Sequence, residues 1–178
     1  MILTGAQIAR EIEGGSITMI PFDKECLTTN SYDLTLGDEY LVYASEILDP
    51  SKNNKYEVKK IPNDGLVLKK GEFVLCHSKE LLGSDNFVPI IHAKSGIARL
   101  GLFVHITADL IDIGSKGNVT FQLYSTLPVR IYSGMKIGQV SFWETKGEIE
   151  LYKGKYQGSS GPRASESYKD FKIEDDLR

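Results

Sequence analysis

The sequence lacks the residue patterns that zinc sites and disulfides need. Its 178 residues include two cysteines, Cys26 and Cys76, and neither belongs to a Cys-x-x-Cys pair. The three histidines, His77, His92 and His105, show no spacing typical of zinc ligands. We therefore expect no structural metal site. No disulfide is suggested, and this cysteine usage fits a reducing cytoplasm.

The sequence also lacks a strong net charge and a long apolar run. Lysine and arginine number 21 against 24 aspartates and glutamates, so the formal charge is only −3 and no basic field attracts nucleic acid or an anionic membrane. No apolar run approaches the roughly 18 residues of a membrane span, and the N-terminus has no signal-peptide pattern. We expect a soluble, cytoplasmic, single-domain protein that binds neither nucleic acid nor membrane.

Short segments rich in β-branched and aromatic residues make up most of the chain. One short helix is predicted over residues 5–12, with Thr4 as its N-cap and Gly14-Gly15 ending it. Strands spaced in this way favour an all-β sandwich or jelly-roll-like barrel over alternating βα units. The predicted strands are 32–36, 40–43, 66–68, 73–76, 88–91, 102–106, 119–124, 129–131 and 139–143.

Turn residues separate these segments. Gly37-Asp38 ends strand 32–36, and we expect 40–43 to pair with it. Residues 50–64 are turn-rich and predict an excursion with an edge strand. From Gly154 the composition shifts to glycine, serine and acidic residues. We expect a barrel domain over 1–153 and a tail or lid over 154–178, with a terminus of no role as the alternative.

Residues 94–122 carry the most chemical information. Lys94-Ser95-Gly96 combines a cation, a hydroxyl and a glycine that permits close backbone approach, which suits a phosphate. An ordinary charged surface turn is the alternative. Asp112 lies among apolar residues and suits activation of a water molecule, unless it merely caps the turn before Gly114. Arg99 follows the apolar residues Ile97 and Ala98, and taken alone it fits a surface arginine.

The chain resembles the dCTP deaminase branch of the dCTP deaminase/dUTPase superfamily over roughly residues 1–171. The segments that carry the resemblance are Pro21-Phe22, 30–37, 95–104, Ile111-Asp112-x-Gly114-x-x-Gly117, 127–129, 134–139, 154–158 and Gly161-Pro162. The resemblance implies dUTPase-like barrel or jelly-roll subunits, assembled as a homotrimer with active sites between subunits. It also implies dCTP or dUTP as ligand, dTTP as a candidate inhibitor, Mg²⁺ held mainly by the phosphates, and no zinc.

The same resemblance assigns roles to individual residues. It places Lys94, Ser95 and Gly96 on the phosphates, Arg99 near the reacting centre, and Asp112 beside the deoxyribose as the candidate general base. Thr107 and Ala108 match a segment that contacts the base, and Lys155 and Tyr156 match residues that close over the triphosphate. Family deaminases usually have the sequence Arg-Ser-Ser where this chain has Lys94-Ser95-Gly96. Gly96 matches the Arg-Ser-Gly sequence of dUTPases, whereas Lys94 stands in place of the arginine of both. Asp109 and Ser159 also depart from the family pattern. Tyr32 and Asp33 are expected to have structural roles, Tyr32 in the core or an interface and Asp33 in a turn or an inter-subunit bond.

Gln122 is the most consequential departure. Family deaminases carry a glutamate at this position, five residues after the second glycine of the motif. Deamination at C4 of cytosine requires a group that takes a proton from water and delivers protons to departing ammonia, and a neutral amide cannot do this. Gln122 can still read a base, because its amide offers a donor and an acceptor, or it can bond within the barrel.

Three functions therefore compete. Our main expectation is Mg²⁺-dependent diphosphate release from dUTP or dCTP by attack of water at the α-phosphate, using the 94–96 turn, Arg99, Asp112 and Gln122. The alternative is deamination of dCTP to dUTP, alone or combined with diphosphate release. The third is a nucleotide-binding protein with weak catalysis.

Overall fold

A computed structural model describes residues 1–171, so positions 172–178 of the predicted tail lie outside the described residues. Within this range the chain is mostly strands. The elements are α1 (Gly5–Glu13), β1 (Ile17–Ile20), η1 (Lys24–Cys26), β2 (Tyr32–Tyr43), β3 (Tyr56–Lys60), β4 (Leu66–Leu68), β5 (Phe73–Ser84), β6 (Phe87–Ala93), α2 (Ser95–Ala98), β7 (Leu102–Val104), β8 (Lys116–Ser125), β9 (Val129–Ile131), β10 (Lys136–Glu144) and η2 (Ser167–Asp170).

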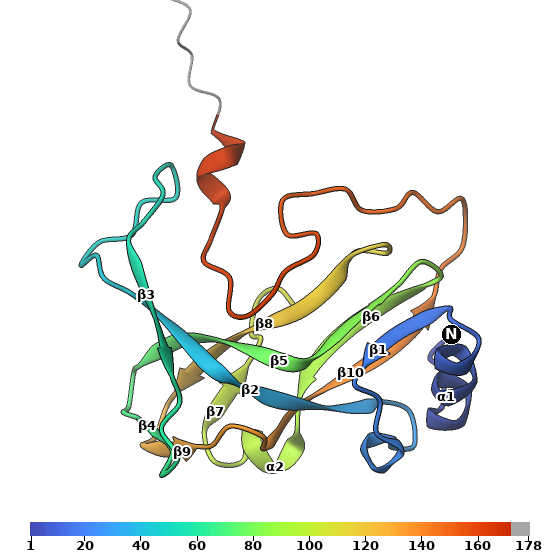
Figure 1. The fold of residues 1–178 in the computed structure, drawn as a ribbon, viewed down its shortest axis with the longest axis horizontal. Helices are drawn as coiled ribbons and strands as arrows, with labels where there is room; N and C mark the ends of the chain where they lie inside the picture. Colours follow the sequence, from blue (N-terminus) through green and yellow to red (C-terminus); the bar gives the residue numbers. More distant parts are fainter. Residues whose placement is uncertain (172–178) are drawn as a thin grey trace, which may run out of the picture.

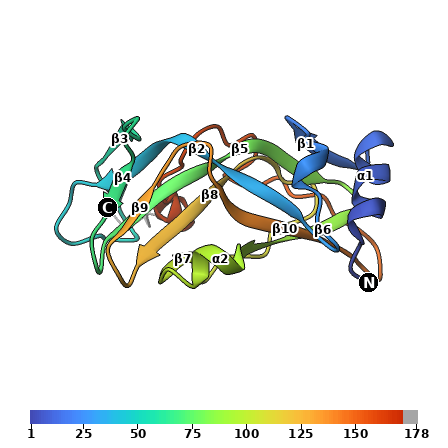
Figure 2. The ribbon, with the colours of Figure 1, turned by 90° about the horizontal axis from the view of Figure 1, so that it is seen from below.

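The strands form a nearly closed antiparallel barrel (Figure 1). Its main sheet runs β6-β10-β2-β5-β8-β7, with β1 on β5 and β3 on β2, while β4 and β9 form a separate pair. Helix α1 lies at one end of the barrel and β3, β4 and β9 lie at the other (Figures 1 and 2). This confirms the predicted all-β barrel with a short N-terminal helix. Residues 1–171 contain no helix with the length and hydropathy of a membrane span.

Alternation along the strands sends apolar side chains into one core. In β8, Val119, Phe121 and Leu123 are buried. Successive side chains of a strand point to opposite faces, so Thr120 and Gln122 face away from these core residues. Each fully buried large apolar side chain stabilises the fold by about 1.5–3 kcal/mol. The core therefore fixes which residues of β8 remain available for chemistry.

Strand β2 is continuous, so the prediction of two strands paired across Gly37-Asp38 is wrong. Gly37 is buried within β2, and a β-carbon there would overlap the imidazole of His77. The pairing of β2 with β5 shifts register between Leu36 and Tyr40. Gly37 is thus a point of close approach at an irregularity in the sheet, which a sequence pattern does not distinguish from a turn.

Gly37→Ala is expected to destabilise the protein, because the added methyl must displace the buried His77 ring. Overpacking of this kind typically costs about 1–3 kcal/mol. Urea unfolding of the variant checks this estimate. The double variant Gly37→Ala/His77→Ala, which removes the obstructing ring, should be less destabilised than the sum of the two single changes. Unaltered stability of Gly37→Ala would contradict the packing described here.

Segments 66–68 and 73–76 are strands, as predicted. Their partners were not predicted: β4 pairs with β9, and β5 pairs with β1, β2 and β8. Strand β1 and helix α2, each four residues long, were not predicted. The edge strand expected within 50–64 is confirmed as β3, which is exposed throughout and pairs with β2.

Candidate active site

A cavity of about 630 Å³ lies between β8, the loop after β7 and the C-terminal segment, which is the part of the chain from residue 145, after β10, to residue 171. Figure 1 shows this segment crossing above β8. The cavity collects predicted site residues from distant parts of the sequence: Thr107, Ala108, Asp112, Gln122 and Tyr156. The same cavity is therefore lined by the two residues predicted to contact the base, by the candidate general base Asp112, and by Gln122, where family deaminases carry glutamate.

Gln122 reaches this cavity because of its place in β8. Its neighbours Phe121 and Leu123 point into the core and are fully buried, so the Gln122 side chain points the other way and is partly exposed. Its backbone carbonyl accepts a hydrogen bond from the His105 amide at 3.3 Å. Among the described residues no side-chain partner holds the Gln122 amide, so it does not serve as an internal hydrogen-bonding group of the barrel.

Asp112 stands exposed at the cavity rim, in the turn that leads into β8. The glycines of the Asp112-x-Gly114-x-x-Gly117 motif have a steric explanation. Gly114 adopts a φ of +88°, and a β-carbon there would lie 2.9 Å from the amide nitrogen of Tyr152. A β-carbon at Gly117 would lie 2.7 Å from the amide nitrogen of Ser159. The glycines let the C-terminal segment pass directly against the turn that carries the carboxylate.

Side chains of the barrel and of the segment itself hold the C-terminal segment over the cavity. The hydroxyl of Tyr43 accepts a hydrogen bond from the Ser165 amide at 2.8 Å, and that of Tyr156 accepts one from the Glu166 amide at 2.9 Å. The Asn118 side chain accepts one from the Gly161 amide at 3.2 Å. No sequence signal marks Tyr43 and Asn118 as residues that bind this segment, because their partners are backbone amides more than 40 residues away.

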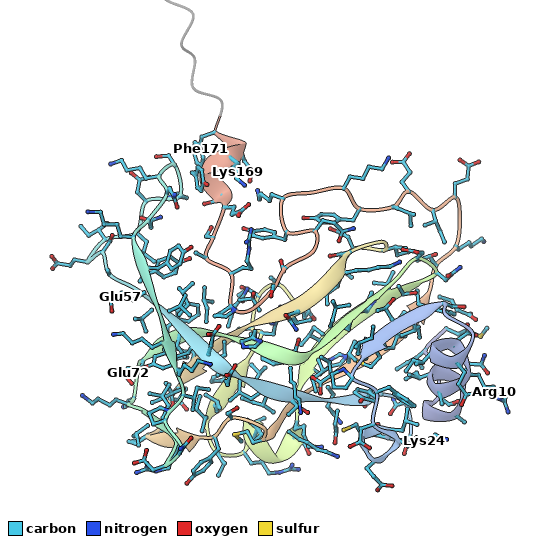
Figure 3. All side chains as sticks on the ribbon, viewed as in Figure 1. Arg10, Lys24, Glu57, Glu72, Lys169 and Phe171 are labelled. Atoms are coloured by element: carbon cyan, nitrogen blue, oxygen red, sulfur yellow. The ribbon has the colours of Figure 1, made fainter. Side chains whose placement is uncertain are left out.

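Residues of the predicted tail therefore line the cavity, whereas their role as a lid over an active site stays a prediction. Lys155, predicted to close over the triphosphate, does not line the cavity, and its ammonium pairs with Asp170. This carboxylate raises the pKa of Lys155. Lys169 and Phe171 lie at the far end of this segment (Figure 3), where Lys169 pairs with Glu166 at 2.6 Å. The phosphate role of Lys155 stays a prediction.

The predicted phosphate turn lies elsewhere on the subunit. Neither Lys94, Ser95 and Gly96 nor Arg99 lines the cavity. Ser95 opens α2, which Figure 1 shows on the opposite side of the barrel from the C-terminal segment. Ser95, Gly96 and Arg99 are exposed there. Within one subunit, the predicted phosphate turn and Arg99 do not meet the residues that are predicted to contact the base.

Lys94 is engaged inside its own subunit. Its ammonium lies 2.6 Å from the buried carboxylate of Asp33, which also accepts a hydrogen bond from the Gln139 side chain at 3.1 Å. Asp33 lies within β2, so the turn that we gave as one alternative is wrong, whereas the inter-subunit bond stays a prediction. The buried Tyr32 accepts a hydrogen bond from the Asp23 amide at 2.9 Å, as its structural role requires. Asp33 thus fixes Lys94 at the start of α2.

His105 is a cavity residue that sequence analysis missed. The residue is 9% exposed, and its ring meets Phe121 edge-on and carries a buried Nδ1 atom without a hydrogen-bond partner among the described residues. Its φ of +60° is left-handed, a conformation that costs a non-glycine residue about 1–3 kcal/mol. Burial lowers the pKa of the ring, although the Ala108 backbone and Asp109 oppose this shift. No motif or spacing in the sequence marks this histidine.

The sequence of this chain is similar to known proteins over most of its length. A family model described as dCTP deaminase-like matches residues 2–145. The chain belongs to the dCTP deaminase family. It is 43% identical over 172 residues to the dUMP-forming dCTP deaminase of Leptospira biflexa serovar Patoc, covering 96% of this chain and 98% of that one. It is 40% identical to the protein of the same name from Clostridium beijerinckii, covering 96% and 99%.

A solved structure of a dCTP deaminase shares the fold of this chain. The 2′-deoxycytidine 5′-triphosphate deaminase of Agrobacterium tumefaciens superposes with a TM-score of 0.63 at 20% identity. The match covers 79% of this chain and 47% of the Agrobacterium chain, so this chain spans about half of that protein. Membership in the dCTP deaminase family identifies the chain as an enzyme and does not support the alternative of a merely nucleotide-binding protein.

Proposed function

We propose that this enzyme converts dCTP and water into dUMP, releasing both ammonia and diphosphate. The observation that carries the proposal is the end-to-end similarity to relatives named as dUMP-forming dCTP deaminases. This similarity supports our alternative, deamination combined with diphosphate release, better than our main expectation of diphosphate release from dUTP. One cavity that contains both Asp112 and Gln122 is compatible with two reactions on one bound nucleotide.

In this proposal one part of the cavity binds the base and another part, at the rim, activates the water that attacks the α-phosphate. Thr107, Ala108 and Gln122 bind the pyrimidine, because the amide of Gln122 offers both a donor and an acceptor to its polar edge. Asp112 orients or deprotonates the water that attacks the α-phosphate, since an exposed carboxylate at the rim is free to hydrogen-bond a solvent molecule. The cover formed by the C-terminal segment limits access of bulk water during the reaction.

Magnesium would reach the site with the triphosphate. Within residues 1–171, no three histidine, cysteine or acidic side chains converge to hold a metal ion. The single carboxylate of Asp112 at the rim fits an ion held mainly by phosphate oxygens and water. When bound, such an ion neutralises charge on the phosphates. Inhibition by dTTP and a cytoplasmic location stay predictions from the sequence.

We further propose that the site is completed by a second copy of the chain in a homotrimer. Ser95 and Arg99 are exposed and do not line the cavity of their own subunit, so in the proposed trimer they would meet the cavity of a neighbouring copy. In a closed ring, each interface joins two different surfaces of the same chain. The Lys94–Asp33 ion pair would hold the first surface rigid.

Mixing two inactive variants tests this composite site. Arg99→Ala and Asp112→Asn should each be inactive alone, but co-expressed subunits should recover about a quarter of wild-type activity, because random assembly pairs an intact Arg99 with an intact Asp112 at that fraction of interfaces. Diphosphate release by the purified mixed oligomer is the measurement. Mixed oligomers that remain inactive would mean that each subunit holds a complete site of its own.

The proposed function itself is tested by product analysis. The enzyme is incubated with dCTP and Mg²⁺, and ammonia and diphosphate are measured in the same samples. We expect both products to increase in parallel. Release of diphosphate without ammonia would contradict the proposal and indicate that the enzyme only hydrolyses the triphosphate. Release of ammonia without diphosphate would indicate a deaminase whose product is dUTP.

A further inference from the structure

Deamination in this cavity needs a proton carrier other than position 122. Water contributes two protons to the reaction, one to N3 of the pyrimidine and one to the departing amino group. The Gln122 amide can hydrogen-bond to these atoms but does not exchange protons with them at neutral pH. If the proposed function holds, another group in the cavity wall moves the protons.

The other ionisable groups of the cavity are poorly suited to this task. A tyrosine hydroxyl and an arginine guanidinium can donate protons in hydrogen bonds but are very weak bases, so neither residue type suits a group that takes a proton from water. Tyr43 and Tyr156 also hold backbone amides of the C-terminal segment. Asp112 lies at the rim, where we place the attack on the α-phosphate. Of the ionisable residues lining this cavity, His105 alone has an ordinary pKa near neutrality and no other assignment.

His105 is held beside position 122. Its amide donates to the Gln122 carbonyl at 3.3 Å, and its ring packs edge-on against Phe121, the residue before Gln122. Its Nδ1 is itself buried and has no hydrogen-bond partner among residues 1–171, and the residue as a whole is 9% exposed. Buried polar atoms are nearly always paired, and of the two unpaired buried side-chain nitrogens of residues 1–171, His77 Nε2 and His105 Nδ1, only that of His105 belongs to a residue that lines the cavity. We infer that a molecule bound there completes its hydrogen bond.

Two further features support a chemical role. The left-handed backbone at His105 is rare for a non-glycine residue, and such conformations cluster at functional sites. Burial lowers the pKa of the imidazole, which favours the neutral ring that can accept a proton. The tautomer with hydrogen on Nε2 leaves Nδ1 as the acceptor.

We propose that His105 is the proton carrier of the deamination step, in place of the carboxylate that position 122 lacks. Its Nδ1 takes a proton from water as the oxygen bonds to C4, and the C4–N3 π pair moves onto N3, which receives that proton. The imidazole then takes the proton of the new C4 hydroxyl and delivers it to the amino nitrogen. The C4–N bond breaks, C4=O forms, and ammonia leaves. The ring ends neutral, and dCTP and water have become dUTP and ammonia.

The variant His105→Asn removes the imidazole while keeping a residue that tolerates left-handed backbone. We expect ammonia release from dCTP to fall by about 10²–10⁴-fold, and diphosphate release from dUTP to fall at least tenfold less. His92→Asn is the matched control, because His92 lies on β6, is exposed and does not line the cavity. It should release ammonia at the wild-type rate.

A double variant separates proton transfer from a structural role. His105→Asn/Gln122→Glu should regain ammonia release, because a carboxylate at 122 replaces the lost carrier. Rescue also shows that the variant loop is folded. If His105→Asn alone keeps ammonia release, or if both products fall together without rescue, His105 merely shapes the cavity and the inference is overturned. A wild-type enzyme that releases no ammonia would instead overturn the proposed function on which this inference rests.

Discussion

Replacing Asp112 with asparagine is expected to lower diphosphate release by about 10²–10⁴-fold, the usual loss when a positioned general base is removed. Asparagine keeps the size and hydrogen-bonding shape of the side chain but cannot take a proton from water. Deamination should be affected less, because it takes place at the base. The variant should therefore accumulate dUTP from dCTP, which chromatography of the nucleotide products detects.

Asp109→Asn is the control for this change. Asp109 lies in the same loop, is exposed and does not line the cavity, so its amide variant should release diphosphate within about threefold of the wild type, as surface substitutions usually do. Equal losses in the two variants would point to a general effect of charge in the loop. Full diphosphate release by Asp112→Asn would show that the base has been wrongly assigned.

Introducing glutamate at position 122 is expected to raise ammonia release from dCTP by at least about tenfold, out of the 10²–10⁴-fold that a positioned acid–base group contributes. The outward face of β8 presents this side chain to the cavity, and no described side chain competes for it. The added carboxylate can then accept the proton of water directly. Steady-state ammonia production at saturating dCTP measures the gain.

Gln122→Met distinguishes the carboxylate from a simple change of shape. Methionine has a similar length and no proton to exchange, so it should not raise ammonia release and should weaken binding of the base. If Gln122→Met raised ammonia release as glutamate does, the effect would come from packing. If Gln122→Glu had no effect, the native carrier would already saturate the proton-transfer step.

Much of the fold follows from local sequence signals. The cap at Thr4 and the period-two alternation of residues such as Phe121 and Leu123 predict elements that the structure contains. Strand pairing was harder to predict, because it depends on partners far along the chain. Gly37 shows this: its small size serves the His77 ring 40 positions away, and the sequence pattern alone resembles a turn.

The site was predictable only in part for a similar reason. Asp112, Thr107 and Gln122 could be named because the resemblance marks them, and the structure brings them to one cavity. His105 carries no motif, since its importance arises from burial, a left-handed backbone and an unpaired nitrogen. The 94–96 turn was found by its chemistry, but the face of the barrel that carries it could not be read from local pattern.

The nucleotide product of dCTP tests the central claim most directly. The enzyme is mixed in excess with labelled dCTP and Mg²⁺, and the labelled monophosphate is identified after a single turnover together with the released ammonia. The proposed function predicts dUMP with an equal amount of ammonia. Formation of dCMP with diphosphate and no ammonia would show that the cavity cleaves phosphate without deaminating the base, and would contradict the account.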